Sequence, residues 1–235
     1  MLKSLVPNLL TLSNLACGLL GILAILKGDF LTAAYLCGGS LIFDFMDGFA
    51  ARALGVHSEL GKQLDSLADM VSFGVVPGFL LFKLFGLAEF GAEPIPDFLK
   101  YLGLLVPLFS ALRLAKFNID ERQSDYFIGM PTPANALFIF AVALTAVHSG
   151  NESLKAILLH PVLLTGLSIG TSILLVAELP LMSLKAKNVK WADNKGRIIL
   201  LAIILLLVVT LRLRAALFII PLYLILSLIF KPTSK

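Results

Sequence analysis

Long apolar stretches separated by short polar segments follow one another along most of the chain. The first runs from Asn8 to Leu26 without a charged residue, which is about the length that a helix needs to cross a bilayer. The stretches do not alternate between apolar and polar residues, so they predict helices rather than the strands of a membrane barrel. A helix also pairs its own backbone N–H and C=O groups, as lipid requires. The pattern therefore predicts an all-α fold, a polytopic membrane helical bundle of about eight spans.

The composition supports this class. Of the 235 residues, 58% are hydrophobic and 14% are charged, whereas soluble domains are about 45–50% apolar and about 25% charged. The formal net charge is +4, but the basic residues are not clustered with exposed aromatic residues, so no nucleic-acid partner is expected. Loop lysines and arginines beside anionic membrane lipids account for the charge. Cys17 and Cys37 lie inside apolar stretches and are expected to be core residues, not a disulfide.

The expected spans form a single integral-membrane domain over residues 1–235. If the N-terminus lies inside, most of the 19 Lys and Arg residues fall on the inner side. The link between the second and third spans then lies on the cytoplasmic side. We expect the spans at about residues 8–26, 30–54, 60–85, 98–117, 134–146, 156–179, 198–211 and 215–230.

Four aspartates lie in the two spans that flank this link. Asp44 and Asp47 are three residues apart on the second span, and Asp65 and Asp69 are four apart on the third, so each pair shares a helix face. An ionisable side chain in lipid is costly and usually has a partner and a function. Four like charges repel each other unless a cation lies between them. A tight turn near Gly55 would bring the two faces together into a site for Mg²⁺ or Mn²⁺, which prefer oxygen ligands.

Small residues and one cation accompany the acids. Gly48, Ala51 and Gly61 lie about one turn from an aspartate, where the missing side-chain bulk lets helices, or a phosphate, approach the backbone. Arg52 supplies a positive charge for an acid or a substrate phosphate. A purely structural ion-pair network is the alternative, but four acids would then share one nearby arginine.

The same stretch carries a family resemblance. It reads Asp44-x-x-Asp47-Gly48-x-x-Ala51-Arg52, then eight residues, then Gly61-x-x-x-Asp65-x-x-x-Asp69. This matches every fixed position of the CDP-alcohol phosphotransferase signature, so the chain resembles that family. The resemblance implies a six-helix core over residues 7–180, with residues 181–235 added as a basic loop and a helical hairpin. It also implies two divalent cations held by the four aspartates, a second role for Asp69 as the base, and a homodimer.

The resemblance extends to a nucleotide site. Asn8, Thr11, Asn14 and Gly18 form one polar and small face on the first span, which could simply pack helices together. In the family, the beginning of this helix lies against the cytidine end of the nucleotide. The contacts implied with the CDP-lipid are Pro7, Asn8, Thr11, Asp44, Asp47, Gly48, Ala51, Arg52, Gly61 and Asp65.

Two further stretches, residues 111–118 and 129–134, resemble the bacterial and archaeal family members that use serine. The resemblance implies transfer of the phosphatidyl group of CDP-diacylglycerol to the serine hydroxyl, giving phosphatidylserine and CMP. Arg113 could bind the serine carboxylate with two hydrogen bonds, and Asn118 and Thr132 are further candidate contacts. Alternatively, Arg113 is an ordinary basic residue at the cytoplasmic end of a helix.

Two other functions remain open. A sister transferase would use another acceptor, such as glycerol 3-phosphate, inositol phosphate or choline. The phosphorylated acceptors would favour a denser basic cluster than this sequence has. A transporter would move a cation past the aspartates. Against it, the aspartates lie near one membrane surface, and no pair of interrupted mid-membrane helices is evident.

Overall fold

The computed structural model describes residues 2–56, 58–90, 93–94, 96–120, 127–181, 191–211 and 215–230. This part of the chain is helical apart from turns and four two-residue strands. The α-helices are α1 (Leu2–Leu26), α2 (Phe30–Ala53), α3 (Glu59–Asp69), α4 (Val76–Phe85), α5 (Leu105–Ile119), α6 (Thr132–His148), α7 (Glu152–Leu158), α8 (Pro161–Val176), α9 (Trp191–Leu211) and α10 (Ala216–Ile229). A π-helix, η1 (Met70–Val75), joins α3 to α4, and a 3-10 helix, η2 (Asp97–Leu104), leads into α5.

The strands form two antiparallel pairs. In the first, β1 (Glu89–Phe90) pairs with β2 (Glu93–Pro94). In the second, β3 (Phe127–Ile128) pairs with β4 (Pro180–Leu181) and connects the segment before α6 to the segment after α8. Next to this pair, the backbone N–H of Met130 donates to the carbonyl of Leu174 across 2.9 Å. The beginning of α6 is therefore fixed to the end of α8.

Among the described residues, four helical stretches are long and apolar enough to cross a membrane: Ser4–Leu26, Phe30–Ala53, Glu59–Phe85 and Asp97–Ile119. The bent pair α7 and α8 makes a fifth if it counts as one span. Shorter apolar helices are Thr132–His148, Ile198–Leu211 and Leu217–Ile229. These findings are consistent with the expected helical membrane protein.

The sixth expected span is not one continuous helix. The predicted stretch of residues 156–179 is divided into the end of α7 and all of α8, whose axes differ by 50°. Pro161 lacks an N–H and disfavours helical geometry at the residue before it. His160 accordingly has an extended backbone with a ψ of 130°. Apolar composition alone did not reveal this break.

The third expected span contains a π-helix. The stretch from Glu59 to Phe85 is helical throughout, but η1 occupies residues 70–75 and begins directly after Asp69. Single π-helical turns inside α-helices are rare and occur frequently at functional sites.

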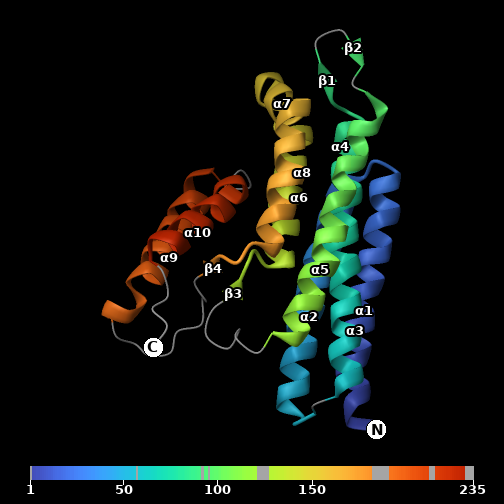
Figure 1. The fold of residues 1–235 in the computed structure, drawn as a ribbon, viewed down its shortest axis with the longest axis vertical. Coiled ribbons are helices and arrows are strands. Elements are labelled where there is room, and N and C mark those ends of the chain that lie inside the picture. Colours follow the sequence, from blue (N-terminus) through green and yellow to red (C-terminus); the bar gives the residue numbers. More distant parts are fainter. Residues whose placement is uncertain are drawn as a thin grey trace.

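Figure 1 shows how the helices are arranged. α1 packs along both α2 and α3, and the N-terminus lies at the same end of the molecule as the short link between α2 and α3. The β1–β2 pair lies at the opposite end (Figure 1). α10 packs against α6 and α9, so the C-terminal helices lie on the far side of the molecule from α1 (Figure 1).

α4 is the centre of the apolar core. Leu80, Leu81 and Leu84 are fully buried and pack with Ile25 of α1 and Ile139 of α6. Side chains on the outer faces remain exposed, as expected where lipid is the neighbour. Because lipid tails are as apolar as leucine, close packing and buried hydrogen bonds stabilise such a bundle more than hydrophobicity does.

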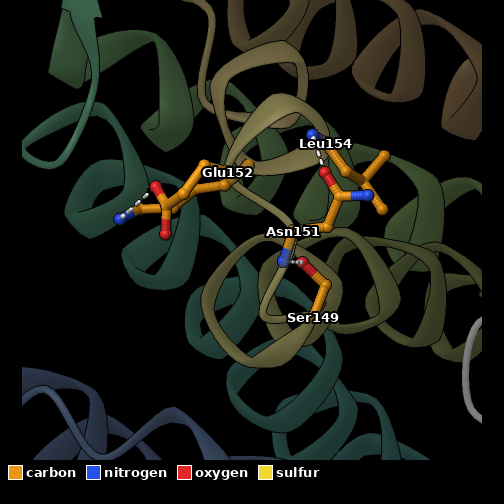
Figure 2. Close-up of polar contacts among 5 residues, drawn as sticks. Ser149, Asn151, Glu152 and Leu154 are labelled. Carbon is orange, nitrogen blue, oxygen red and sulfur yellow. Dashed lines mark hydrogen bonds and ion pairs between the residues drawn. The ribbon is translucent and has the colours of Figure 1, made fainter.

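The turn between α6 and α7 is held by its own polar side chains. Figure 2 shows Asn151 directed at Leu154, whose backbone N–H donates to Oδ1 of Asn151 across 3.0 Å. The N–H of Asn151 donates in turn to the hydroxyl of Ser149 across 3.3 Å. Asn151 thus caps the first turn of α7, where an unpaired N–H needs an acceptor. α7 begins at Glu152, before the sixth expected span at residues 156–179.

Candidate metal and nucleotide site

The link between α2 and α3 turns the chain back tightly. Gly55 has a φ of +64°, a left-handed conformation that glycine adopts without strain. Ser58 then begins α3, where its hydroxyl accepts from the N–H of Gly61 across 3.2 Å. This geometry returns α3 along the same end of the bundle, where it packs against α1 and faces α2 across a cavity.

Three of the four predicted metal ligands come together at this end. Asp44, Asp47 and Asp65 each present an oxygen, and these oxygens lie within 4.8 Å of one another. Asp47 is buried, and Oδ1 of Asp65 is buried without a hydrogen-bond partner among the described residues. Three carboxylates at this separation repel one another unless a cation compensates them. The donor set is entirely oxygen and therefore fits Mg²⁺ or Mn²⁺.

Asp69 lies apart from the group of three. It is the last residue of α3, one turn beyond Asp65, and interacts electrostatically with the three other acids. Its Oδ1 accepts a hydrogen bond from Nδ2 of Asn14 across 3.1 Å. The structure thus divides the predicted quartet into three clustered acids and one neighbour held by α1.

α1 also contacts the cluster through Thr11. The hydroxyl of this residue donates to Oδ2 of Asp47 across 2.6 Å. Thr11 is 3% exposed, so the hydrogen bond is shielded from water. A donor at this position stabilises the charged form of Asp47 and fixes its orientation.

A cavity of about 240 Å³ adjoins the acids. Of the predicted nucleotide contacts, all except Asp44 and Arg52 line it. The exposed Arg52 lies beside Gly48: its Nη1 is 3.3 Å from the position that a Cβ on Gly48 would occupy. The cavity is lined by Pro7, Asn8, Thr11, Asp47, Gly48, Ala51, Val56, Ser58, Gly61, Lys62 and Asp65.

Arg113 lies deeper in the bundle. It is 8% exposed, and its guanidinium lies 5.7 Å from the ring centre of Phe117 and interacts electrostatically with Asp69. Its Nε is buried without a partner among the described residues. Burying an arginine with an unused donor is costly, so a bound anion at this point would stabilise it.

The other two predicted serine contacts have different surroundings. Thr132, in the first turn of α6, is fully buried, and its hydroxyl has no partner in the part of the chain that the structure describes. Asn118 connects two helices. Its side-chain Nδ2 donates to the hydroxyl of Ser66, and its backbone carbonyl accepts from Nζ of Lys62, both across 2.8 Å. Asn118 therefore fastens the end of α5 to α3.

Sequence reasoning did not assign a role to Asn14. Asn14 belongs to the polar face of the first span, three residues after Thr11. Its hydrogen bond to Asp69 depends on how α1 packs against α3, which spacing alone does not give. The π-helix after Asp69 was also missed, since its residues are as apolar as those of an ordinary span.

Comparison with known proteins defines the class. Residues 4–168 match the model of the CDP-alcohol phosphatidyltransferase family. The chain belongs to this family.

Individual relatives are similar over much of the chain. A protein of Helicobacter pylori (strain ATCC 700392 / 26695) named CDP-diacylglycerol–serine O-phosphatidyltransferase is 33% identical over 229 residues, which are 96% of this chain and 90% of that one. A protein of Bacillus subtilis (strain 168) with the same name is 34% identical over 140 residues, 60% of this chain and 76% of its own. An archaetidylserine synthase of Methanothermobacter thermautotrophicus is 34% identical over 146 residues, 61% of this chain and 59% of its own.

Proposed function

We propose that this protein transfers the phosphatidyl group of CDP-diacylglycerol to the hydroxyl of L-serine, giving phosphatidylserine and CMP. The observation that carries the proposal is the cluster of Asp44, Asp47 and Asp65 beside a cavity lined by the family's nucleotide contacts. Serine as the acceptor is supported by the relatives that carry the serine transferase name, one of which aligns with 96% of this chain.

Asp44, Asp47 and Asp65 would hold the divalent cations, two Mg²⁺ or Mn²⁺, with Asp69 as a fourth ligand. When bound, the cations supply positive charge that neutralises the pyrophosphate and the departing CMP. Thr11 keeps Asp47 directed into the cluster through its 2.6 Å hydrogen bond. Oδ1 of Asp65, which is buried without a hydrogen-bond partner among the described residues, supports a ligand role, because a bound cation would satisfy it.

The reaction is a substitution at phosphorus. The serine oxygen forms a bond to the phosphorus that carries diacylglycerol, and the bond from that phosphorus to the oxygen of CMP breaks. Asp69 accepts the proton of the hydroxyl as attack develops, since a hydroxyl is otherwise a poor nucleophile. Arg113 binds the serine carboxylate near Asp69, and Thr132 is a second contact. Asn118 would contact serine only by giving up its hydrogen bond to Ser66.

In the membrane, we propose eight spans, of which the six-helix core covers residues 7–180, and residues 181–235 form the basic loop and C-terminal hairpin. The acids and the cavity would lie at the cytoplasmic surface, where most Lys and Arg residues are expected. The N-terminus and the α2–α3 link lie at one end of the bundle (Figure 1), which supports this arrangement. We also propose a homodimer, as is common in the family.

A transfer assay with a choice of acceptors tests the function. Purified protein would receive CDP-diacylglycerol, Mg²⁺ or Mn²⁺, and labelled serine, glycerol 3-phosphate, inositol phosphate or choline in separate reactions. We expect phosphatidylserine from serine only, and no product after chelation of the cation. A lipid product from another acceptor would make the protein a sister transferase. No lipid product with any acceptor, together with cation flux in vesicles that Asp69→Asn abolishes, would identify a transporter instead.

A further inference from the structure

Asn14 of α1 forms a hydrogen bond with Asp69, the candidate base at the end of α3. Its Nδ2 donates to Oδ1 of Asp69 across 3.1 Å. Asn14 is fully buried, whereas Asp69 is partly accessible. An ionised carboxylate oxygen can accept hydrogen bonds but cannot donate them, so the amide must present its NH₂ group to it. This hydrogen bond fixes the orientation of the Asp69 carboxylate.

The backbone of Asn14 is itself fixed. Its carbonyl oxygen accepts from the hydroxyl of Ser40 on α2 and from the hydroxyl of Ser72 on η1, each across 3.1 Å. Both serines are buried. These two hydroxyls connect the carbonyl of Asn14 to α2 and to η1, which restricts movement of α1 relative to both.

Gly18 allows this contact. A Cβ at Gly18 would lie 2.5 Å from the hydroxyl oxygen of Ser72 and 3.1 Å from its Cα. η1 can therefore approach α1 only because residue 18 has no side chain. The π-helix begins directly after Asp69, so the same element that Ser72 fastens to Asn14 also sets the end of α3.

We infer that Asn14 is a positioning residue that holds Asp69 in the orientation needed to accept the acceptor's proton, and that Ser40 and Ser72 fix Asn14 for this task. The inference rests on the proposed function. It differs from a packing role, because the donor atom and not the volume of the side chain would matter. It also differs from a nucleotide-binding role, because Asn14 does not line the cavity.

Four variants test the inference: Asn14→Ala removes the amide, Asn14→Leu keeps the branched shape without a donor, Asn14→Asp replaces the donor with an acid, and Ser72→Ala removes one anchor. We expect kcat to fall about 10- to 100-fold in Asn14→Ala and Asn14→Leu alike, as for loss of a hydrogen bond to a charged group. Asn14→Asp should fall further because two acids would face each other. Ser72→Ala, which leaves the donor in place, should lose only about 2- to 5-fold.

Binding is measured alongside turnover. The KM for CDP-diacylglycerol and the rise in melting temperature on adding this lipid with Mg²⁺ should stay near the wild-type values in Asn14→Ala and Asn14→Leu. Ser13→Ala is the matched control: Ser13 is half-buried on the same helix, and its hydroxyl donates to the carbonyl of Leu9 across 2.9 Å. Its kcat should be unchanged.

Three results would overturn the inference. One is near wild-type kcat in Asn14→Leu with a loss in Asn14→Ala, which indicates packing. The second is loss of CDP-diacylglycerol binding in proportion to kcat, which indicates that the whole site has changed. The third is unchanged turnover in both variants. With an active wild-type protein, each of these rejects the role of Asn14 alone. A wild-type protein without transferase activity would reject the proposed function and this inference with it.

Discussion

Thr11 on α1 donates its hydroxyl hydrogen to Oδ2 of Asp47 on α2 across 2.6 Å. One turn further along α1, Asn14 donates to Asp69 at the end of α3. The same helix therefore orients one acid from each of its two neighbours. The acids cannot move independently of α1, because both donors are buried and each has its acceptor in place.

Asp65→Asn should abolish transfer. The exchange keeps the shape of the side chain but can place an NH₂ group where a ligand oxygen is needed. We expect activity to fall about 100-fold or more, since a metal contributes several kcal/mol of charge stabilisation. The stabilising effect of Mn²⁺ on the melting temperature should be lost as well.

The control for that experiment is Asp29→Asn. Asp29 caps α2, where its Oδ1 accepts from the N–H of Thr32 across 3.0 Å, and asparagine caps a helix about as well. Equal activity of this variant and the wild type would show that an Asp-to-Asn change outside the cluster is tolerated. Normal turnover in Asp65→Asn would contradict a ligand role for Asp65.

Thr11→Val should lower kcat/KM for CDP-diacylglycerol without abolishing activity. Valine has the same shape as threonine but no hydroxyl, so Asp47 would lose its donor. A hydrogen bond to a charged group contributes about 1.5–3 kcal/mol, which corresponds to about 10- to 100-fold in kcat/KM for CDP-diacylglycerol. Steady-state kinetics with varied lipid measure this loss; Thr11→Ser, which keeps the hydroxyl, should recover most of it.

Arg113→Ala should raise the KM for serine by about 10-fold or more, because a charge-assisted pair with the carboxylate would be lost. The KM for CDP-diacylglycerol should change little. Lys116→Ala is the matched control, since Lys116 is an exposed base on the same helix. Equal effects of the two variants would mean that both act only as basic residues at a helix end, and an unchanged serine KM would remove Arg113 from the pocket.

Gly18→Ala should destabilise the contact between α1 and η1. The added Cβ would meet Ser72 at 2.5 Å, and overpacking of this kind costs about 1–3 kcal/mol. We expect a lower melting temperature together with reduced kcat. Gly38→Ala, on α2 with no atom within 4 Å of the added Cβ, should lower neither, because alanine favours a helix interior more than glycine does. A Gly18→Ala protein as stable and active as Gly38→Ala would contradict the close approach.

Much of the fold follows from local sequence. The apolar lengths predicted α2 almost to the residue, from Phe30 to Ala53, because a run of that length in lipid has to be helical. The break before Pro161 was missed because hydropathy averages over it, although proline carries the physical signal. α1 begins at Leu2, ahead of the first expected span at residues 8–26, and Pro7 is accommodated inside the helix.

The spacing of Asp44, Asp47, Asp65 and Asp69 by itself determined that acids would share faces of two consecutive helices, because helical periodicity is a local property. The tertiary structure alone decided that three of them cluster while Asp69 is held by Asn14. That division depends on how closely α1 approaches η1, which is set by the absence of a side chain at Gly18 and by the hydroxyl of Ser72, far away in sequence. Contacts between distant segments arise from packing in three dimensions, and no periodicity along the chain encodes them.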